Sequence, residues 1–401
     1  MMRERSPIVD LGSTYRRAIW WSVVALGSAA LFVPAQSFPG TQDVKTITGW
    51  IHAALRLGLA EGLAVPRDYP PASTVIHWTL VTTGIVSVES VVKLTNLATL
   101  VLFAVFCATR QTQRGAQVLA IFALSSAFLG YTDILFAPFA FFLSRKRSPL
   151  WAVFLSFLLM VLLKWTALVA TPLILARMLQ HSRAHGWGSA LRAGVPAGII
   201  LTATLVYFSP FVMFDKFHYA MKTTVAPSAN ALNPHWLYAL FAFDGAPYGS
   251  SAYTSLWPSY EILCTALTLL LCAGFALLWL ATGASPQSWL VALRGTLAGY
   301  FLFAYSVHEN HLFLTVLITL FGYWAGVFPR WQLCTAAGFF NANLFLFYGL
   351  TGTQRPVEGN EWVGVVFTLI GNLALIAMIV HDVRHLLMAD QNHVVKSFSH
   401  R

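Results

Sequence analysis

Apolar segments separated by short polar connections follow one another along almost the whole sequence. A helix that crosses a bilayer needs about 20 predominantly apolar residues, so a chain of 401 residues has room for about twelve such helices and little else. We predict membrane-spanning helices near residues 18–35, 90–109, 116–131, 133–144, 149–163, 165–180, 194–210, 259–281, 289–306, 310–328, 332–350 and 362–381. The pattern predicts an all-α polytopic membrane protein whose single membrane-embedded domain covers residues 1–401.

Two stretches depart from a simple series of spans. Residues 149–176 form one apolar run that Lys164 and Pro172 interrupt. As one helix this run would be ~42 Å long, which exceeds the ~30 Å hydrocarbon core, so we predict two short helices that turn at Lys164–Trp165. Residues 72–89 are only moderately apolar and are interpreted as a re-entrant or interfacial segment.

The connections 36–89 and 211–258 are much longer than the others, and the second is followed by the C-terminal helices of residues 259–401. Within the first connection, apolar and polar residues alternate at helical spacing. The apolar positions are Val44, Ile47, Ile51, Ala54, Leu55 and Gly58, and the polar positions are Lys45, Thr48, His52 and Arg56. This pattern predicts an amphipathic helix that lies at the membrane surface.

The composition supports the membrane assignment and excludes several functional classes. Hydrophobic residues make up 57% of the chain and charged residues 10%, whereas a soluble domain has about 25% charged residues. Secreted enzymes, nucleic-acid-binding proteins and cytosolic dehydrogenases are therefore excluded. The net charge of +10 is interpreted as a sign of membrane orientation, since basic residues collect on the cytoplasmic side.

The distribution of charge predicts which side carries the chemistry. With both chain ends in the cytoplasm, 17 of the 25 Lys and Arg residues fall inside, and 11 of the 15 acidic residues fall at the outer face. Both long connections then lie outside, so the candidate site faces outward. The compact loops favour a multi-pass protein of a bacterial inner membrane with its site facing the periplasm, rather than one of the endoplasmic reticulum.

Two acidic positions of the first long connection are candidates for chemistry. Asp43 begins the predicted surface helix, where it is either a helix cap or a general base that deprotonates a sugar hydroxyl. Asp68 precedes Tyr69-Pro70-Pro71, and the two prolines fix an extended turn. Taken alone, this turn is a loop corner, and it gains meaning only together with Asp43.

Further polar groups stand at predicted outward turns. Asp133 follows Gly130-Tyr131-Thr132, and Lys164 at the next outward turn is its natural partner. Because a charge at membrane depth is paired or functional, this pair is either a structural ion pair or a ligand contact. His308-Glu309-Asn310-His311 lacks the HExxH spacing of a metal site and is interpreted as a substrate contact. Asn233 and Trp236 in the second long connection, and Arg355 near a later outward turn, are additional candidates.

The order of these residues resembles a known family. An acid opens the first outer loop, Asp68-Tyr69-Pro70-Pro71 ends it, and a Gly-x-x-Asp turn, an outward lysine, an Asn-x-x-Trp loop and a His-Glu pair follow. In this order and topology, residues 15–360 resemble the GT-C superfamily of integral-membrane glycosyltransferases, which use polyprenyl-phosphate sugars as donors. Dolichyl-phosphate-glucose-dependent glucosyltransferases and bacterial mannosyl- or glucosyltransferases of similar design are the members it resembles.

The resemblance implies roles for the first group of residues. Asp43 matches the catalytic acid that acts as general base on the acceptor hydroxyl. Asp68 and Tyr69 match the turn that closes the first outer loop against the membrane domain. Asp133 matches the acid of a Gly-Gln-x-Asp-like turn in which Tyr131 replaces the usual Gln.

The remaining matches concern the donor phosphate. His308 and Glu309 match a His-Glu-Lys motif near that phosphate, but Asn310 stands where the family has the cation. The resemblance leaves three candidates for the missing charge, which are Lys164, Lys93 and Arg355. It assigns Asn310, His311, Asn233 and Trp236 to the acceptor side or to the shape of the site.

The implied reaction is an inverting transfer of a hexose, glucose or mannose, from a polyprenyl-phosphate-linked donor to a lipid-linked or glycan acceptor. The implied partners are these two substrates and membrane lipids, without nucleic acid. No cofactor is implied, and the sequence has no DxD pair that would suggest a metal. The alternative is a polytopic transporter or flippase for a lipid-linked sugar, and a non-catalytic membrane scaffold is a third possibility. A glycosyltransferase predicts that Asp43, Asp133 and His308 meet at one outer cavity, whereas a transporter predicts a central pathway with two gates.

Overall fold

The computed structural model describes residues 11–64, 69–145, 148–209, 212–217, 257–282, 285–304, 307, 309–353, 356 and 361–398. Every regular element in these ranges is a helix, and no strand occurs in them. In chain order they are α1 (Leu11–Ser37), α2 (Gln42–Leu57), α3 (Leu59–Ala64), α4 (Ala72–Thr82), α5 (Val88–Arg110), α6 (Thr112–Ala123), η1 (Leu124–Phe128), η2 (Thr132–Phe136), α7 (Ala137–Ser144), α8 (Leu150–Leu163), η3 (Trp165–Ala170), α9 (Thr171–His185), α10 (Trp187–Phe208), α14 (Trp257–Ala281), α15 (Pro286–Phe303), η4 (Glu309–Leu312), α16 (Phe313–Trp324), α17 (Arg330–Tyr348) and α18 (Glu361–Phe398).

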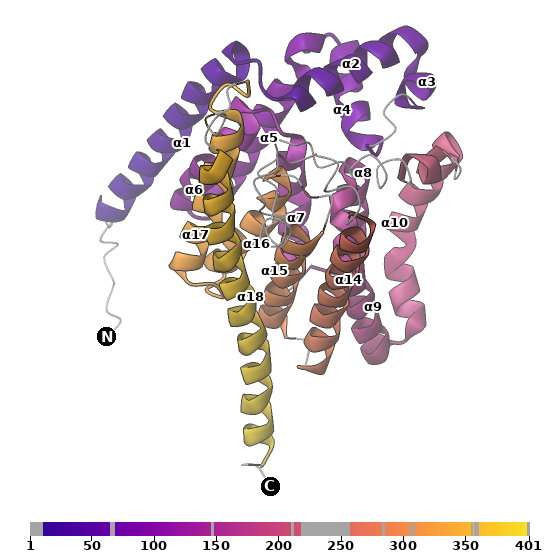
Figure 1. Ribbon diagram of the computed structural model, residues 1–401, viewed down its shortest axis with the longest axis vertical. Helices are drawn as coiled ribbons and strands as arrows, with labels where there is room; N and C mark the ends of the chain where they lie inside the picture. The colour runs from indigo at the N-terminus through magenta and orange to yellow at the C-terminus, as the bar shows by residue number, and fades with distance from the viewer. Residues whose placement is uncertain are drawn as a thin grey trace, which may run out of the picture.

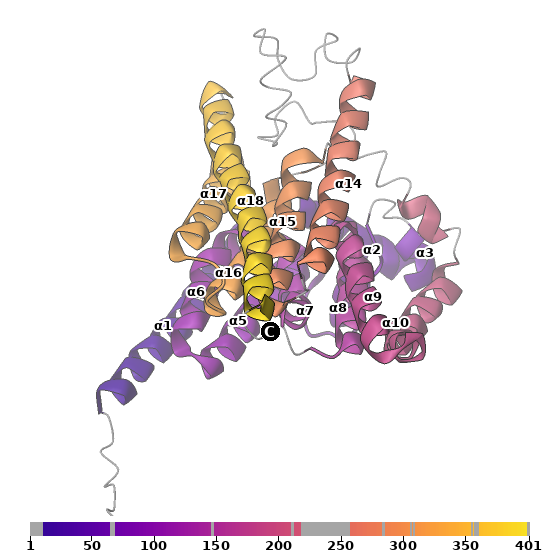
Figure 2. The ribbon, with the colours of Figure 1, turned by 90° about the horizontal axis from the view of Figure 1, so that it is seen from below.

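The long helices form a bundle, and three short helices cover one end of it. In Figure 1, α1 and α10 lie at opposite edges of the bundle, and α2, α3 and α4 lie across its upper end. Figure 2, viewed from below, shows the same two edges and the long α18 rising along the bundle. We refer to α2, α3 and α4 together as the cap.

The bundle has one continuous apolar core. It extends from Val24 on α1 to Leu386 on α18. Near its centre, Phe122 packs against Phe313 with ring centroids 4.6 Å apart, and Phe313 packs against Phe340 at 6.0 Å. These rings come from α6, α16 and α17, so aromatic packing joins helices that are distant in sequence, at about 0.5–1.5 kcal/mol per pair beyond area burial.

Five helices in the described ranges are long and apolar enough to cross a membrane: Thr14–Ser37, Val88–Arg110, Trp187–Phe208, Ile262–Ala281 and Val366–Met388. Shorter apolar helices occupy Thr132–Ser144, Leu150–Leu163 and Asn310–Trp324. These findings show an all-α membrane protein, and to this extent the sequence prediction is confirmed. A helix overlaps each of the predicted segments, but how many of them cross a bilayer stays a prediction.

The predicted break at Lys164 is confirmed. Helix α8 ends at Leu163, Lys164 is extended with φ −162° and ψ 136°, and the tight helix η3 begins at Trp165. Pro172 follows in the first turn of α9, where its missing N–H costs no helical hydrogen bond. The break turns the backbone so that Lys164 lies between two short helices instead of inside one long helix.

Helix α2 of the cap covers the residues of the predicted amphipathic helix, and it buries Val44, Ile47, Ile51, Ala53 and Ala54. These side chains face a small apolar cluster that also includes Val91 and Val92 of α5. Two predicted members of this apolar face lie differently. Leu55 is 41% exposed, and Gly58 is exposed beyond the helix end with φ +86°, because α2 stops at Leu57 and leaves its last turn at the edge of the contact. The position of α2 at a membrane surface stays a prediction.

Candidate functional site

The start of α2 is attached to two distant parts of the chain. The N–H of Thr41 donates to the carbonyl oxygen of Leu129 at 3.0 Å, and the N–H of Gly40 donates to that of Thr351 at 3.0 Å. Thr41 is buried, so these bonds satisfy backbone groups that water does not reach. The helix carrying Asp43 is therefore held in place by the segment before Asp133 and by the turn after α17.

Glycines make this attachment possible. A Cβ on Gly352 would lie 2.2 Å from the carbonyl carbon of Gly40, and a Cβ on Gly130 would lie 2.5 Å from the side chain of Val44. Gly40, Gly130 and Gly352 all have positive φ, between +76° and +85°, a conformation that L side chains rarely adopt. Three backbone segments thus approach one another at a distance that side chains would prevent.

Asp43 lies in the first turn of α2 and is partly buried. The next residue, Val44, contacts Gly130, so Asp43 stands beside the segment that leads into Asp133. A helix N-terminus favours a carboxylate, and this geometry is compatible with either interpretation drawn from the sequence. Asp43 thus lies at the edge of the cap, in the first turn of its longest helix.

Asp133, Lys164 and Asn310 form a buried polar group, which we call the Asp133 cluster. Lys164 Nζ lies 3.1 Å from Oδ1 and 3.4 Å from Oδ2 of Asp133, and Asn310 Nδ2 donates to Oδ2 at 3.2 Å. The side chains of Lys164 and Asp133 are 10% and 3% exposed. The predicted pairing of Asp133 with Lys164 is confirmed, and the structure adds Asn310 of the predicted His-Glu-Asn-His run.

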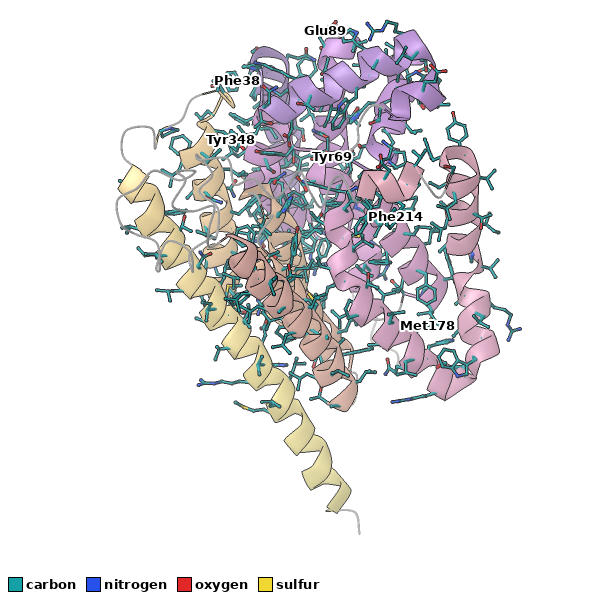
Figure 3. All side chains as sticks on the ribbon, turned by 45° about the vertical axis from the view of Figure 1, so that its right-hand side comes forward. Phe38, Tyr69, Glu89, Met178, Phe214 and Tyr348 are labelled. Atoms are coloured by element: carbon teal, nitrogen blue, oxygen red, sulfur yellow. The ribbon has the colours of Figure 1, made fainter. Side chains whose placement is uncertain are left out.

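Tyr69 connects the Asp133 cluster to the cap. The ammonium of Lys164 lies 6.0 Å from the centre of the Tyr69 ring, and this ring is 5.3 Å from that of Trp50 on α2. Figure 3 shows Tyr69 beneath the cap, with Phe214 of the short helix 212–217 on the neighbouring side. Trp165 packs edge-on against Phe217 at 5.6 Å. Tyr69 is thus the aromatic ring that faces the Lys164 ammonium, and a second aromatic pair begins at the next residue along the chain.

Lys93 has a different environment from the one that a donor-phosphate contact needs. Its Nζ donates to the carbonyl oxygens of Pro34 at 2.8 Å and Phe38 at 2.7 Å, and the residue is only 3% exposed. The side chain thus ties the end of α1 to α5. Lys93 is therefore a weaker candidate for the missing phosphate cation than Lys164, because both of its hydrogen bonds hold the backbone at the end of α1.

His311 and Tyr131 lie against aromatic neighbours. The hydroxyl of Tyr300 and His311 Nδ1 are 3.2 Å apart, and the two rings are nearly parallel. Tyr131 is buried and packs edge-on against Tyr348 at 5.8 Å. Both residues are close in sequence to members of the Asp133 cluster, Tyr131 to Asp133 and His311 to Asn310.

The remaining candidates cannot be placed. Asp68, Asn233, Trp236, His308 and Arg355 lie outside the described residues, and for Glu309 the backbone alone is described, as the first residue of η4. Among the described candidates, contacts join Tyr69, Asp133, Lys164 and Asn310, and a backbone hydrogen bond attaches the start of α2, which carries Asp43, to Leu129.

Two buried polar features were not singled out from the sequence. One is His77 of α4, which is fully buried and whose pKa burial lowers from 6.5 to about 4. The other is Arg294 of α15, which donates to Asp382 through Nε at 2.9 Å and through Nη2, and to Gln332 Oε1 through Nη1 at 2.8 Å. We call this second group the Arg294 cluster. Arg294 is the single charged residue of the helix Pro286–Phe303, and His77 is the single ionisable residue of α4, and these were the available signals.

Comparison with known proteins adds no relative. No protein-family model matches this sequence, and no curated protein matches it.

Proposed function

We propose that this membrane protein is an inverting glycosyltransferase of the GT-C type, which moves glucose or mannose from a polyprenyl-phosphate-linked donor to a lipid-linked or glycan acceptor. In this proposal about twelve helices cross a bacterial inner membrane, the cap lies at its periplasmic surface, and α2 rests along the boundary between lipid and water. The donor then enters from the bilayer and the acceptor from the lipid or the water side.

One observation carries the proposal. The start of α2, with Asp43, is bonded at Thr41 to Leu129, and the chain continues from Leu129 to Asp133, which contacts Lys164 and Asn310. A carboxylate, a cation and an amide from separate helices therefore gather at one end of the bundle. The backbone hydrogen bond at Thr41 attaches the helix that carries Asp43 to the segment that leads to this polar group, and this attachment supports the proposal.

The chemistry follows from these groups. The carboxylate of Asp43 accepts the proton of the acceptor hydroxyl while that oxygen attacks the anomeric carbon of the donor sugar. The bond from this carbon to the phosphate oxygen breaks, and polyprenyl phosphate leaves with the bonding electrons. Attack from the face opposite the phosphate inverts the anomeric configuration. A general base of this kind contributes about 10²–10⁴-fold.

Lys164 is the best-placed cation for the leaving phosphate. Among the described residues it donates only to Asp133, and an ammonium has three N–H groups, so it retains donor capacity. Electrostatic stabilisation of developing charge is a large term in catalysis when the site excludes water. Lys164 can take this role where Asn310 replaces the cation of the family motif.

The test is transfer of label by reconstituted protein. Wild type and Asp43→Asn are supplied with labelled polyprenyl-phosphate glucose, or separately mannose, together with a lipid extract of the source cells. We expect transfer by wild type and a loss of at least about 100-fold in Asp43→Asn. Glu89→Gln is the matched control, because Glu89 is also an acid in the first turn of a helix but is exposed at the outer edge of the cap end (Figure 3).

Two results would contradict the proposal. Transfer that survives in Asp43→Asn would remove Asp43 as the base while keeping the enzyme class. No transfer by wild type from either donor, combined with passage of the labelled lipid across the bilayer unchanged, would favour the flippase.

A further inference from the structure

A set of buried polar side chains lies close to Lys164 and has no part in the proposed reaction. Ser73, Thr74 and His77 of α4 are at most 1% exposed. Their positions i, i+1 and i+4 place them on one face of the helix. Because α4 packs against α2, α5 and α8, this face is turned into the protein.

These side chains lack protein hydrogen-bond partners among the described residues. This holds for the hydroxyl oxygens of Ser73 and Thr74 and for both ring nitrogens of His77. The indole N–H of Trp165 and the hydroxyl of Thr166, directly after Lys164 in the sequence, are also buried without a hydrogen-bond partner among the described residues. A buried polar group without a partner costs about 1–3 kcal/mol, and more than 90% of such groups are normally paired. Several together indicate a surface that is built to receive hydrogen bonds.

The neighbourhood of α4 places this surface beside the candidate site. Helix α4 begins two residues after Pro70, and Tyr69 lies 6.0 Å from Lys164. Farther along α4, Leu80 and Val81 pack against the apolar cluster beneath α2. The polar face therefore lies between the Lys164 break and that apolar cluster.

The chemistry of the face selects a class of ligand. Hydroxyl groups both donate and accept hydrogen bonds, and an uncharged imidazole offers one donor and one acceptor. His77 is uncharged at neutral pH, since burial lowers its pKa to about 4. None of Ser73, Thr74 and His77 then carries a charge at that pH. Such a surface suits neutral hydroxyl groups, whereas a phosphate or a carboxylate would require a cation.

We propose that Ser73, Thr74 and His77 form a subsite that binds the hydroxyl groups of a neutral sugar beneath the cap. The sugar is the hexose or the acceptor of the transfer reaction, and this assignment rests on the proposed function. The subsite itself rests on the buried, unpartnered groups of α4. Tyr69 and Trp50 beside it supply the aromatic surface against which the apolar face of a sugar ring packs.

The experiment measures binding without turnover. Protein in lipid nanodiscs is titrated with radiolabelled n-octyl β-D-glucoside below its micelle concentration, and n-octyl phosphate serves as the anionic comparison probe. We compare wild type with Ser73→Ala, Thr74→Val, His77→Leu and His77→Gln. Thr79→Val is the matched control, because Thr79 lies on the exposed face of α4 and its hydroxyl donates only within the helix, to Val75.

We expect saturable glucoside binding by wild type and at least tenfold weaker binding by Thr74→Val and His77→Leu, with Thr79→Val and His77→Gln within about threefold of wild type. Thermal unfolding of the free protein separates binding from folding. Ser73→Ala and Thr74→Val should be as stable as wild type or more stable, because they remove unpaired polar groups. Glucoside binding that is absent in wild type, or that is unchanged in Thr74→Val and His77→Leu, would overturn the subsite, as would octyl phosphate binding that falls with glucoside binding in these two variants.

The transfer assay of the previous section distinguishes the two proposals. Wild-type transfer with unchanged glucoside binding in the α4 variants would overturn the subsite and leave the enzyme standing. Variant-sensitive glucoside binding without any transfer by wild type would support the subsite and contradict the transferase.

Discussion

The Asp133 cluster and the Arg294 cluster are both buried ion pairs with an added amide, yet they use their hydrogen-bonding groups differently. Arg294 donates through Nε, Nη1 and Nη2 to Asp382 and Gln332, and its guanidinium stacks 3.5 Å from the ring centre of Phe328. Lys164 faces one carboxylate and one distant aromatic ring. The guanidinium is surrounded by fixed partners, whereas the ammonium keeps donor capacity.

This difference separates an ion pair whose cation donates through all three of its nitrogens within the fold from one whose cation still has donors for a further partner. The Arg294 cluster joins α15, α17 and α18, and the fork of the guanidinium matches the carboxylate, so its charges are satisfied by the fold itself. The Asp133 cluster lies near unpartnered polar groups of α4 and η3. The two clusters are both buried but differ in the number of hydrogen bonds that the cation donates among the described residues.

The largest expected effect on stability comes from breaking the ion pair of Arg294 with Asp382. Arg294→Met leaves Asp382 buried without its partner, and we expect a loss of about 3–5 kcal/mol in the free energy of unfolding, measured by SDS titration in mixed micelles. The double variant Arg294→Met/Asp382→Leu should recover most of this loss, because it removes both charges. A single variant as stable as wild type would mean that the Arg294 cluster is not a structural contact.

A loss of stability of comparable size is expected at acidic pH, because of the buried His77 in the cap. The pKa of His77 falls from 6.5 to about 4 on burial, so the unfolded chain binds a proton more readily than the folded protein between these values. Stability is then full above pH 6.5 and is lost as the pH falls towards 4, by about 3 kcal/mol at most. Unfolding measured from pH 7.5 to 4.5 should be less acid-sensitive in His77→Leu. His52→Leu, at an exposed histidine of α2, is the control and should retain the wild-type acid dependence.

The variant Lys164→Met tests the ion pair of Lys164 with Asp133. We expect transfer to fall about 100-fold, which corresponds to about 2.7 kcal/mol of transition-state stabilisation. The stability loss should be smaller than for Arg294→Met, because Asp133 keeps the amide of Asn310. Initial rates per folded protein check this prediction, with Lys164→Arg as the charge-conserving control. An unchanged rate would show that Lys164 is as structural as Arg294.

The smallest effect on stability is expected at the side-chain amide of Asn310. Asn310→Leu removes one hydrogen bond to the carboxylate of Asp133 and should cost about 1.5 kcal/mol of stability. The corresponding amide of the other cluster, in Gln332→Leu, provides the matched measurement, since Gln332 accepts from Arg294. Equal costs would mean that the two amides support their ion pairs to the same degree, and a much larger cost at Asn310 would contradict the comparison.

The sequence predicted the parts of the fold that depend on local pattern. The break at Lys164 followed from the length of residues 149–176 against the thickness of a bilayer, and α2 followed from its helical spacing. The pairing of Asp133 with Lys164 was also predictable, because each was the other's nearest opposite charge at an outward turn. It is confirmed by the contact of Lys164 Nζ with Asp133 Oδ1, two residues that are 31 positions apart in the sequence.

Contacts that depend on tertiary packing were not accessible in the same way. Lys93 was a candidate for the donor phosphate, and nothing in its local sequence indicates that Pro34 and Phe38 offer it two carbonyl groups. Arg294 and Asp382 are 88 residues apart in the sequence, and no local pattern indicates that they form a pair. His77 belongs to no sequence motif, and it became a candidate for ligand binding only because the structure places unpartnered polar groups on the same helix. The transferase assignment itself stays a prediction.

The contact of Gly40 with Gly352 has a consequence for biosynthesis. The acid proposed as the base is near the N-terminus, but part of its support is made only after α17 has been translated and inserted. A nascent chain that stops before this turn lacks the hydrogen bond from Gly40 to Thr351, so the attachment of α2 is completed only near the end of synthesis.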